Sequence, residues 1–74
     1  MTAMAQLDGL HEQILRQLAE GRCTPRYLAG EVEQSRQLVS SRLQDLTMGD
    51  YAIKVDRGLY EITEKGRTEV SGDE

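Results

Sequence analysis

Two helix starts lie close together in the middle of the chain, and they constrain its fold more than any other feature. Thr24 followed by Pro25 is a strong start signal, because threonine caps helix N-termini and proline is favoured at the first helical position. Ser35 gives a second start signal. Helices are therefore expected at about 25–32 and 36–48, separated by only a few residues. Two short helices joined so tightly form a helix-turn-helix unit.

A further helix is expected before this unit. Apolar residues from Leu7 to Leu18 recur at helical spacing, as on one face of an amphipathic helix. Gly21 stands where a left-handed helix C-cap favours glycine, so this helix should reach about residue 20. Asp8 either caps the helix or lies in its first turn.

A β-hairpin is expected after the third helix, because the hydrophobic period changes there. Large apolar residues alternate with smaller or charged ones, as in a half-buried strand: Tyr51, Ile53 and Val55 against Ala52 and Lys54. Asp56-Arg57-Gly58 predicts the turn, with glycine where a positive φ is expected, and the returning strand covers 59–62. Thr63 then starts a short last helix that ends near Val70.

This order of elements predicts an α+β fold, the winged helix-turn-helix. It consists of a three-helix bundle, a two-stranded β-hairpin wing at 51–62 and a short C-terminal helix. The whole chain, 1–74, is expected to form a single domain, with residues 1–6 and 71–74 frayed. A domain of this size buries only about 60% of its unfolded surface, so pairing with a second copy would help to stabilise it.

The helix at 36–48 has two distinct faces. Val39, Leu43 and Leu46 form an apolar stripe that should pack against the first two helices. A second stripe is polar and contains no acid: Gln37, Ser40, Ser41 and Gln44. Glutamine can pair with adenine, arginine with guanine, and serine with donors or acceptors. The stripe therefore suits reading of the DNA major groove, although solvated polar residues on an amphipathic helix would look the same.

The distribution of charge favours DNA more than the total charge does. The chain has a net charge of −4, with 13 acidic and nine basic residues. Residues 22–58 carry six basic against five acidic side chains, a net of +1, so the remaining residues carry −5. The acid therefore lies mostly outside the predicted contact surface. The residues predicted to bind DNA are Arg26, Arg36, Gln37, Ser40, Ser41, Arg42, Gln44, Lys54 and Arg57.

Several functional classes find no support in the sequence. One cysteine, Cys23, and one histidine, His11, cannot supply the four ligands of a structural zinc site or an internal disulfide. Cys23 is expected to fill a small buried space, and His11 to be solvated or at the edge of the core. No membrane span, signal peptide, catalytic constellation or small-ligand pocket is recognisable. The chain is therefore expected to be a cytoplasmic, cofactor-free protein and not an enzyme.

The composition also suggests a salt-rich cytoplasm. Only Lys54 and Lys65 are lysines, and an acidic, lysine-poor surface stays hydrated at high salt; an ordinary acidic protein is the alternative. At molar salt the release of counterions contributes little to DNA affinity. Base-edge and apolar contacts are then expected to supply much of it, with Asp45 and Asp50 as sites that could trap cations.

The chain resembles a known family. "ILRQLAEGRCTPRYLAGEVEQSRQLVSSRLQDL" followed by "GDYAIKVDRGLYEITEKGR" resembles the archaeal winged helix-turn-helix transcriptional regulators, especially the haloarchaeal phage-repressor-like group. The similarity covers about Leu10 to Val70. Its most specific parts are TPRYLA, the helix at 36–48 and RGLYEIT-KG. The chain departs from the family pattern at TMGDY, where Asp50 stands beside the wing.

The resemblance implies binding to an operator in double-stranded DNA as a homodimer, often as a repressor. It implies Arg36, Gln37, Ser40 and Ser41 as base readers and Arg57 as the wing contact. For the dimer, Met4 and Leu7 or the last helix near Val70 would supply the apolar surface. A winged helix that only binds other proteins is the alternative, and loss of DNA affinity on mutation of the polar stripe would distinguish the two.

Overall fold

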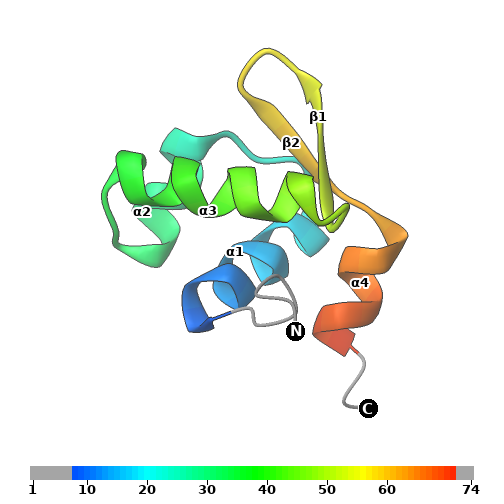
Figure 1. The fold of residues 1–74 in the computed structure, drawn as a ribbon. Helices are drawn as coiled ribbons and strands as arrows, with labels where there is room; N and C mark the ends of the chain where they lie inside the picture. Colours follow the sequence, from blue (N-terminus) through cyan, green and yellow to red (C-terminus); the bar gives the residue numbers. More distant parts are fainter. Residues whose placement is uncertain (1–7, 72–74) are drawn as a thin grey trace.

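The computed structural model describes residues 8–71, and their order of elements is the one expected (Figure 1). The elements are α1 (Gly9–Glu20), α2 (Pro25–Val32), α3 (Arg36–Met48), β1 (Ala52–Asp56), β2 (Leu59–Ile62) and α4 (Glu64–Ser71). The hairpin stands away from the helices, and α4 returns alongside α1. The fold is a winged helix-turn-helix of the α+β class, as predicted.

Side-chain caps fix where the first three helices begin. Asp8 caps α1 by accepting a hydrogen bond from the backbone N–H of His11 at 2.9 Å. Thr24 and Ser35 cap α2 and α3 in the same way, each accepting at 3.1 Å from the N–H three residues later. Glu33 ends α2 in the left-handed conformation, with φ 59°. The chain therefore changes direction within residues 33–35, and this short turn sets the angle between α2 and α3.

The core lies where α1, α2, α3 and the base of the hairpin meet. Val39, Leu43 and Leu46 of α3 are completely buried, as predicted. The remaining buried apolar residues come from the other elements: Ile14, Leu15, Leu18, Cys23, Leu28, Ala52 and Ile62. Each buried leucine or isoleucine contributes roughly 1.5–3 kcal/mol to folding. This apolar side of α3 therefore anchors the helix while its opposite side faces solvent.

The hairpin continues a small sheet that starts in the loop before α2. β1 and β2 are antiparallel, with Ala52 opposite Ile62 and Lys54 opposite Tyr60. The backbone of Cys23 pairs with the other edge of β2 through two hydrogen bonds to Tyr60, of 2.8 and 3.0 Å. The turn is tight, and Gly58 has the expected positive φ of 70°. The wing is thus tied to the helices at its base and free at its tip.

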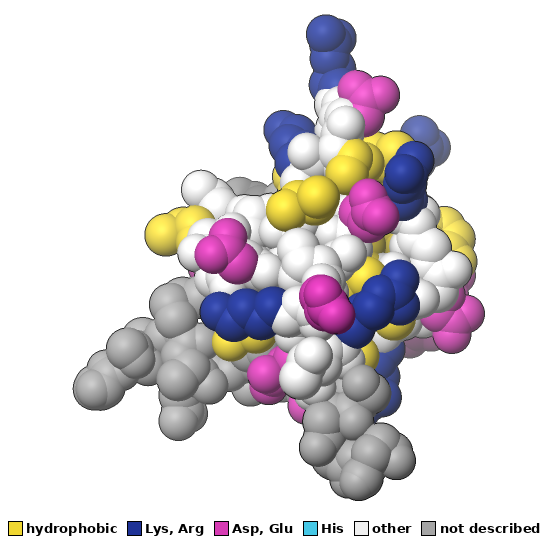
Figure 2. Space-filling model, turned by 90° about the vertical axis from the view of Figure 1, so that its right-hand side faces the viewer, with side chains coloured by type: hydrophobic (Ala, Val, Ile, Leu, Met, Phe, Trp, Pro, Cys, Tyr) yellow, Lys and Arg dark blue, Asp and Glu magenta, His cyan; other side chains and the backbone are white. Residues whose placement is uncertain are grey.

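The predicted apolar face of the wing is wrong. Ala52 is the buried residue of β1, whereas Ile53 and Val55 are 46% and 36% exposed. Figure 2 shows apolar side chains exposed on the surface of the hairpin. The reason is that the buried residues of the hairpin are its first pair, Ala52 and Ile62. That pair sets the alternation, so the larger residues of β1 point outward.

Of the two expectations for His11, solvation is wrong and a place at the edge of the core fits, because its partners Asp8 and Asp45 are half-exposed. Its side chain is buried, with 7% of the residue exposed, and not solvated. The burial is compatible with a polar ring because both nitrogens have partners: Nδ1 accepts from the Asp8 backbone N–H, and Nε2 lies 3.0 Å from an Asp45 carboxylate oxygen. Because a carboxylate oxygen can only accept, Nε2 is the donor in the contact with Asp45.

Smaller differences concern the ends of helices. Gly21 follows α1 as expected, but with φ 158° and ψ 171° it is extended and not a left-handed cap. α4 extends to Ser71, one residue beyond the end expected near Val70. Met4, Leu7 and residues 72–74 lie outside the described residues. Within residues 8–71, no helix is long and apolar enough to cross a membrane.

Candidate nucleic-acid interface

The polar stripe of α3 is open to solvent. Gln37, Ser40, Ser41 and Gln44 are all exposed, and no other part of the described chain covers them. Arg36, at the first position of the helix, is exposed as well. The same helix thus presents a continuous polar surface on one side and a fully buried apolar stripe on the other. A helix that packs on the core by one side and exposes polar residues on the other has the geometry needed to enter the major groove.

One edge of the stripe faces the wing across a cleft. Ser40, Gln44 and Thr47 follow one another at i, i+4 and i+7 along α3, and Lys54 and Tyr60 of the hairpin lie opposite. Together these five residues line a cleft of about 410 Å³. The cleft therefore brings three of the predicted DNA-binding residues, Ser40, Gln44 and Lys54, next to one another.

The other edge of α3 faces α1. Arg42 directs its guanidinium at the cap residue of α1, with Nη2 3.1 Å and Nε 3.2 Å from Asp8 Oδ2. Asp45 accepts the hydrogen bond from His11. Two polar contacts thus hold the start of α1 against the middle of α3. The predicted DNA contact of Arg42 and the predicted cation site at Asp45 would both compete with these contacts.

The Asp8 carboxyl, which pairs with Arg42, has a lowered pKa. The pKa of the Asp8 carboxyl is lowered, chiefly by the hydrogen bond from the His11 backbone N–H and further by the nearby positive charge of Arg42. A carboxylate that accepts an N–H bond and a guanidinium bond at once is stabilised in its charged form. Asp8 therefore both caps α1 and anchors Arg42.

Arginine and lysine side chains differ in whether a carboxylate lies beside them. Arg22 lies 3.6 Å from Glu61, and Arg42 is paired with Asp8. By contrast, four of the predicted DNA-binding cations have no carboxylate partner among residues 8–71: Arg26, Arg36, Lys54 and Arg57. These four come from the start of α2, the start of α3 and the wing. Within residues 8–71 no carboxylate neutralises their charges, which are therefore available to a polyanion.

Three exposed or cleft residues were missed in the sequence. Thr47 and Met48 follow Gln44 on the same side of α3, three and four residues later, and Met48 adds an apolar side chain that is 72% exposed. Helical spacing alone could have included both. Tyr60 was taken only as a strand residue; its place in the cleft follows from the strand register, which the sequence pattern did not give correctly.

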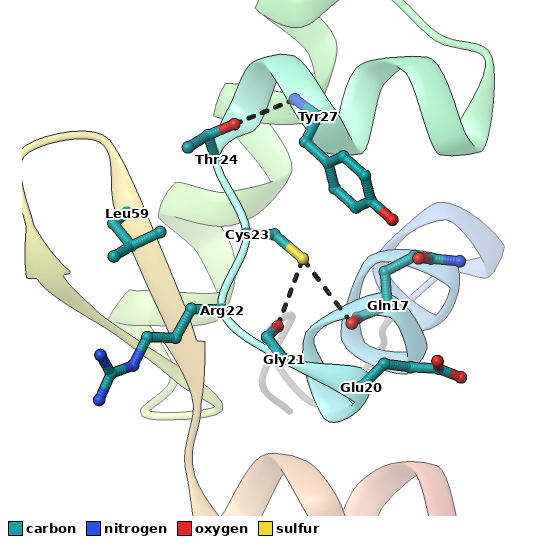
Figure 3. Close-up of a pocket in the computed structure, with 8 residues that line it drawn as sticks. All are labelled: Gln17, Glu20, Gly21, Arg22, Cys23, Thr24, Tyr27 and Leu59. Atoms are coloured by element: carbon teal, nitrogen blue, oxygen red, sulfur yellow. Dashed lines mark hydrogen bonds between the residues drawn. The ribbon is translucent and has the colours of Figure 1, made fainter.

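A second cavity, of about 300 Å³, lies on a different side of the molecule, between the end of α1, the loop before α2 and the wing (Figure 3). Cys23 lies beside it, is buried, and points its Sγ at the carbonyl oxygens of Gln17 and Gly21. Burial, together with the negative charge of Glu31, raises the pKa of this thiol. The prediction of a buried, unreactive cysteine is confirmed as to burial, and a raised pKa disfavours the nucleophilic thiolate. No three metal-ligating side chains gather within residues 8–71.

Comparison with known proteins gives a fold but no family. No family model and no curated protein sequence matches the chain. Among solved structures, the adhesin competence repressor AdcR from Streptococcus pyogenes has a TM-score of 0.81 at 23% identity, over 90% of this chain and 55% of AdcR. Lactococcus lactis ZitR has a TM-score of 0.81 at 27% identity, over 89% of this chain and 47% of ZitR. RosR from H. salinarum has a TM-score of 0.79 at 20% identity, over 92% of this chain and 71% of RosR.

These similarities agree with the winged helix-turn-helix seen in the structure. The chain spans about half the length of AdcR and ZitR. The specific likeness to haloarchaeal phage-repressor-like proteins is not reproduced in this comparison and stays a prediction.

Proposed function

We propose that the protein is a sequence-specific DNA-binding transcriptional regulator. The observation that carries the proposal is the solvent-exposed polar stripe of α3 beside a wing with unpaired cations. Gln37, Ser40, Ser41 and Gln44 would read base edges in the major groove. The similarity to AdcR, a repressor, supports the same class and favours repression.

In this proposal the unpaired cations position the protein on the DNA backbone. Arg26 lies in the first turn of α2, where the helix N-terminus adds its own attraction for a phosphate. Arg57 lies at the tip of the hairpin and would enter or border the adjacent minor groove. Arg42 would reach DNA only by leaving Asp8, so we propose that its main role is to hold α3 in place.

We also propose that the regulator acts as a homodimer, because one domain reads only a few base pairs and two-fold pairing reads a palindrome. Val70, one of the candidate interface residues, packs partly against the core of its own domain. This leaves little of its apolar surface for a partner. A cytoplasmic location at high salt completes the proposal.

The test is the loss of affinity when one base reader is shortened. The target would be a duplex selected from random sequences by the wild-type protein. Gln37→Ala should weaken binding to it about 5- to 100-fold, since a bidentate base contact is worth roughly 1–3 kcal/mol. Gln13→Ala is the matched control, because Gln13 is exposed on α1, away from the stripe. Equal affinity of Gln37→Ala and wild type would remove Gln37 from the base readers, and failure of the wild type to select any duplex would instead favour a winged helix that binds only proteins.

A further inference from the structure

The cleft between α3 and the wing gathers polar side chains that have no partner within residues 8–71. Ser40, Gln44, Lys54 and Tyr60 all line it, and none of their side chains has a hydrogen-bond or ion-pair partner within residues 8–71. The fifth lining residue, Thr47, donates its hydroxyl to the Gln44 carbonyl oxygen at 2.9 Å. Four side-chain donors from two separate elements therefore converge on one hollow, with a single positive charge among them.

The strand register explains why the two wing residues point into this hollow. Lys54 and Tyr60 stand directly opposite each other, two residues along from the pair Ala52 and Ile62 on the same face of the hairpin. Ala52 and Ile62 are 1% and 5% exposed, so this face is the one that turns toward the helices. Lys54 and Tyr60 are the next pair outward and overhang the open side of α3.

The position of the cleft matches that of a DNA strand. If α3 occupies the major groove and the wing reaches the neighbouring minor groove, the sugar-phosphate backbone that separates the two grooves must pass between α3 and the wing. The volume of the cleft, about 410 Å³, is more than ten times that of a water molecule. The cleft therefore has room for a phosphodiester and its sugars.

We propose that this cleft is a binding site for one phosphodiester of each operator half-site. The Ser40 and Tyr60 hydroxyls and the Gln44 amide act as neutral donors, and Lys54 supplies the only charge. This proposal rests on the proposed function, and it moves Ser40 and Gln44 from base reading to the backbone. Thr47 borders the site, and its hydroxyl can join by rotating away from the Gln44 carbonyl.

The composition of the site has a physical consequence for salt. Each lysine or arginine that neutralises a phosphate releases counterions and contributes about −0.9 to the slope of log affinity against log salt. A hydroxyl or amide donor releases none. Tyr60 should therefore contribute affinity that does not decrease as salt rises, whereas the contribution of Lys54 should decrease.

The experiment compares two single variants across a salt series on the selected duplex. Tyr60→Phe should weaken binding about 10- to 150-fold at every salt concentration, with the wild-type slope, because one hydrogen bond to a charged acceptor is lost. Lys54→Gln should make the slope shallower by about 0.9 per bound protomer. Tyr27→Phe is the matched control, since Tyr27 lies beside the other cavity and points toward α1 (Figure 3).

A modified DNA locates the contact. Replacing single phosphates by neutral methylphosphonates should weaken wild-type binding at several positions. At one position per half-site the loss should not add to that of Tyr60→Phe, because both changes remove the same hydrogen bond.

Wild-type affinity for Tyr60→Phe, or full additivity at every phosphate, would overturn the site while leaving the regulator proposal intact. Absence of any sequence-specific binding by the wild type would overturn both. Urea unfolding of Tyr60→Phe provides the check on folding, and an unchanged midpoint is expected because its hydroxyl has no partner within the described chain.

Discussion

The contact between His11 and Asp45 predicts a measurable coupling between α1 and α3. His11 is the buried polar residue of the described chain, and its Nε2 donates to Asp45 at 3.0 Å across 34 positions of sequence. The same ring closes the capping box of α1 by accepting the Asp8 backbone N–H. The two functions can be separated, because a glutamine at this position of a capping box accepts the same N–H without reaching α3.

The size of the coupling follows from the exposure of the two groups. A hydrogen bond to a charged acceptor stabilises a protein by roughly 1.5–3 kcal/mol when it is well shielded from water. The His11 side chain is 9% exposed, but that of Asp45 is 41% exposed, so water competes for the carboxylate. The coupling free energy should therefore be about 1 kcal/mol. In a domain of this size, that loss lowers the Tm by about 4–8 °C.

A double-mutant cycle measures this value. His11→Gln, Asp45→Ala and the double variant would be unfolded in urea and followed by circular dichroism. Asp45→Asn serves as the intermediate case, since an amide oxygen still accepts a hydrogen bond but carries no charge. A coupling indistinguishable from zero, within the roughly 0.3–0.5 kcal/mol expected of independent sites, would refute the view that this contact holds α3 to α1.

Two further predictions concern stability. Gly66→Ala should destabilise the fold by about 3 kcal/mol in urea unfolding, because a Cβ there would overlap the Tyr51 carbonyl oxygen and the Ile62 side chain. Gly30→Ala, in the exposed middle of α2 with no atom near its added Cβ, should stabilise by roughly 0.5–1 kcal/mol, and equal effects of the two changes would contradict this packing. Stability should also fall on acidification: the pKa of Asp8 is depressed in the folded state, so its contribution is fully present above the ordinary value of 3.8 and is lost as the pH falls through the lowered pKa. Asp8→Asn should therefore flatten the dependence of unfolding free energy on pH below about 4, and an unchanged pH profile would show that Asp8 does not gain from folding.

Local chemistry made much of the fold predictable. Thr24, Pro25 and Ser35 act within one turn of the helices they start, so sequence neighbours alone decide their effect. Helical spacing likewise identified the buried side of α3, because three apolar residues at i, i+4 and i+7 can be buried together in only one orientation. The exposed stripe followed as the remaining surface.

The features that were not predicted depend on residues far apart in sequence. Ile53 and Val55 look like core residues, and only the docking of Ala52 against the helices determines that they point outward. His11 looks like a surface residue until α3 brings Asp45 to its second nitrogen. Tyr60 enters the cleft through its register with Lys54. In each case a contact between elements that are far apart in sequence decides where the side chain points, and no local sequence pattern indicates that contact.

Pairing between charges also explains how an acidic chain could approach DNA. Asp8 neutralises Arg42, and Glu61 lies beside Arg22, so these acids lie against cations outside the exposed stripe of α3. Four of the predicted DNA-binding cations have no carboxylate partner within the described chain, and four phosphate contacts would give a salt slope of about −3.6. That dependence would remove most of their contribution at molar salt. The hydroxyl and amide donors in the cleft would lose none of their contribution to the affinity. An acidic protein with few lysines could therefore still bind a phosphate at salt concentrations where charge contributes little.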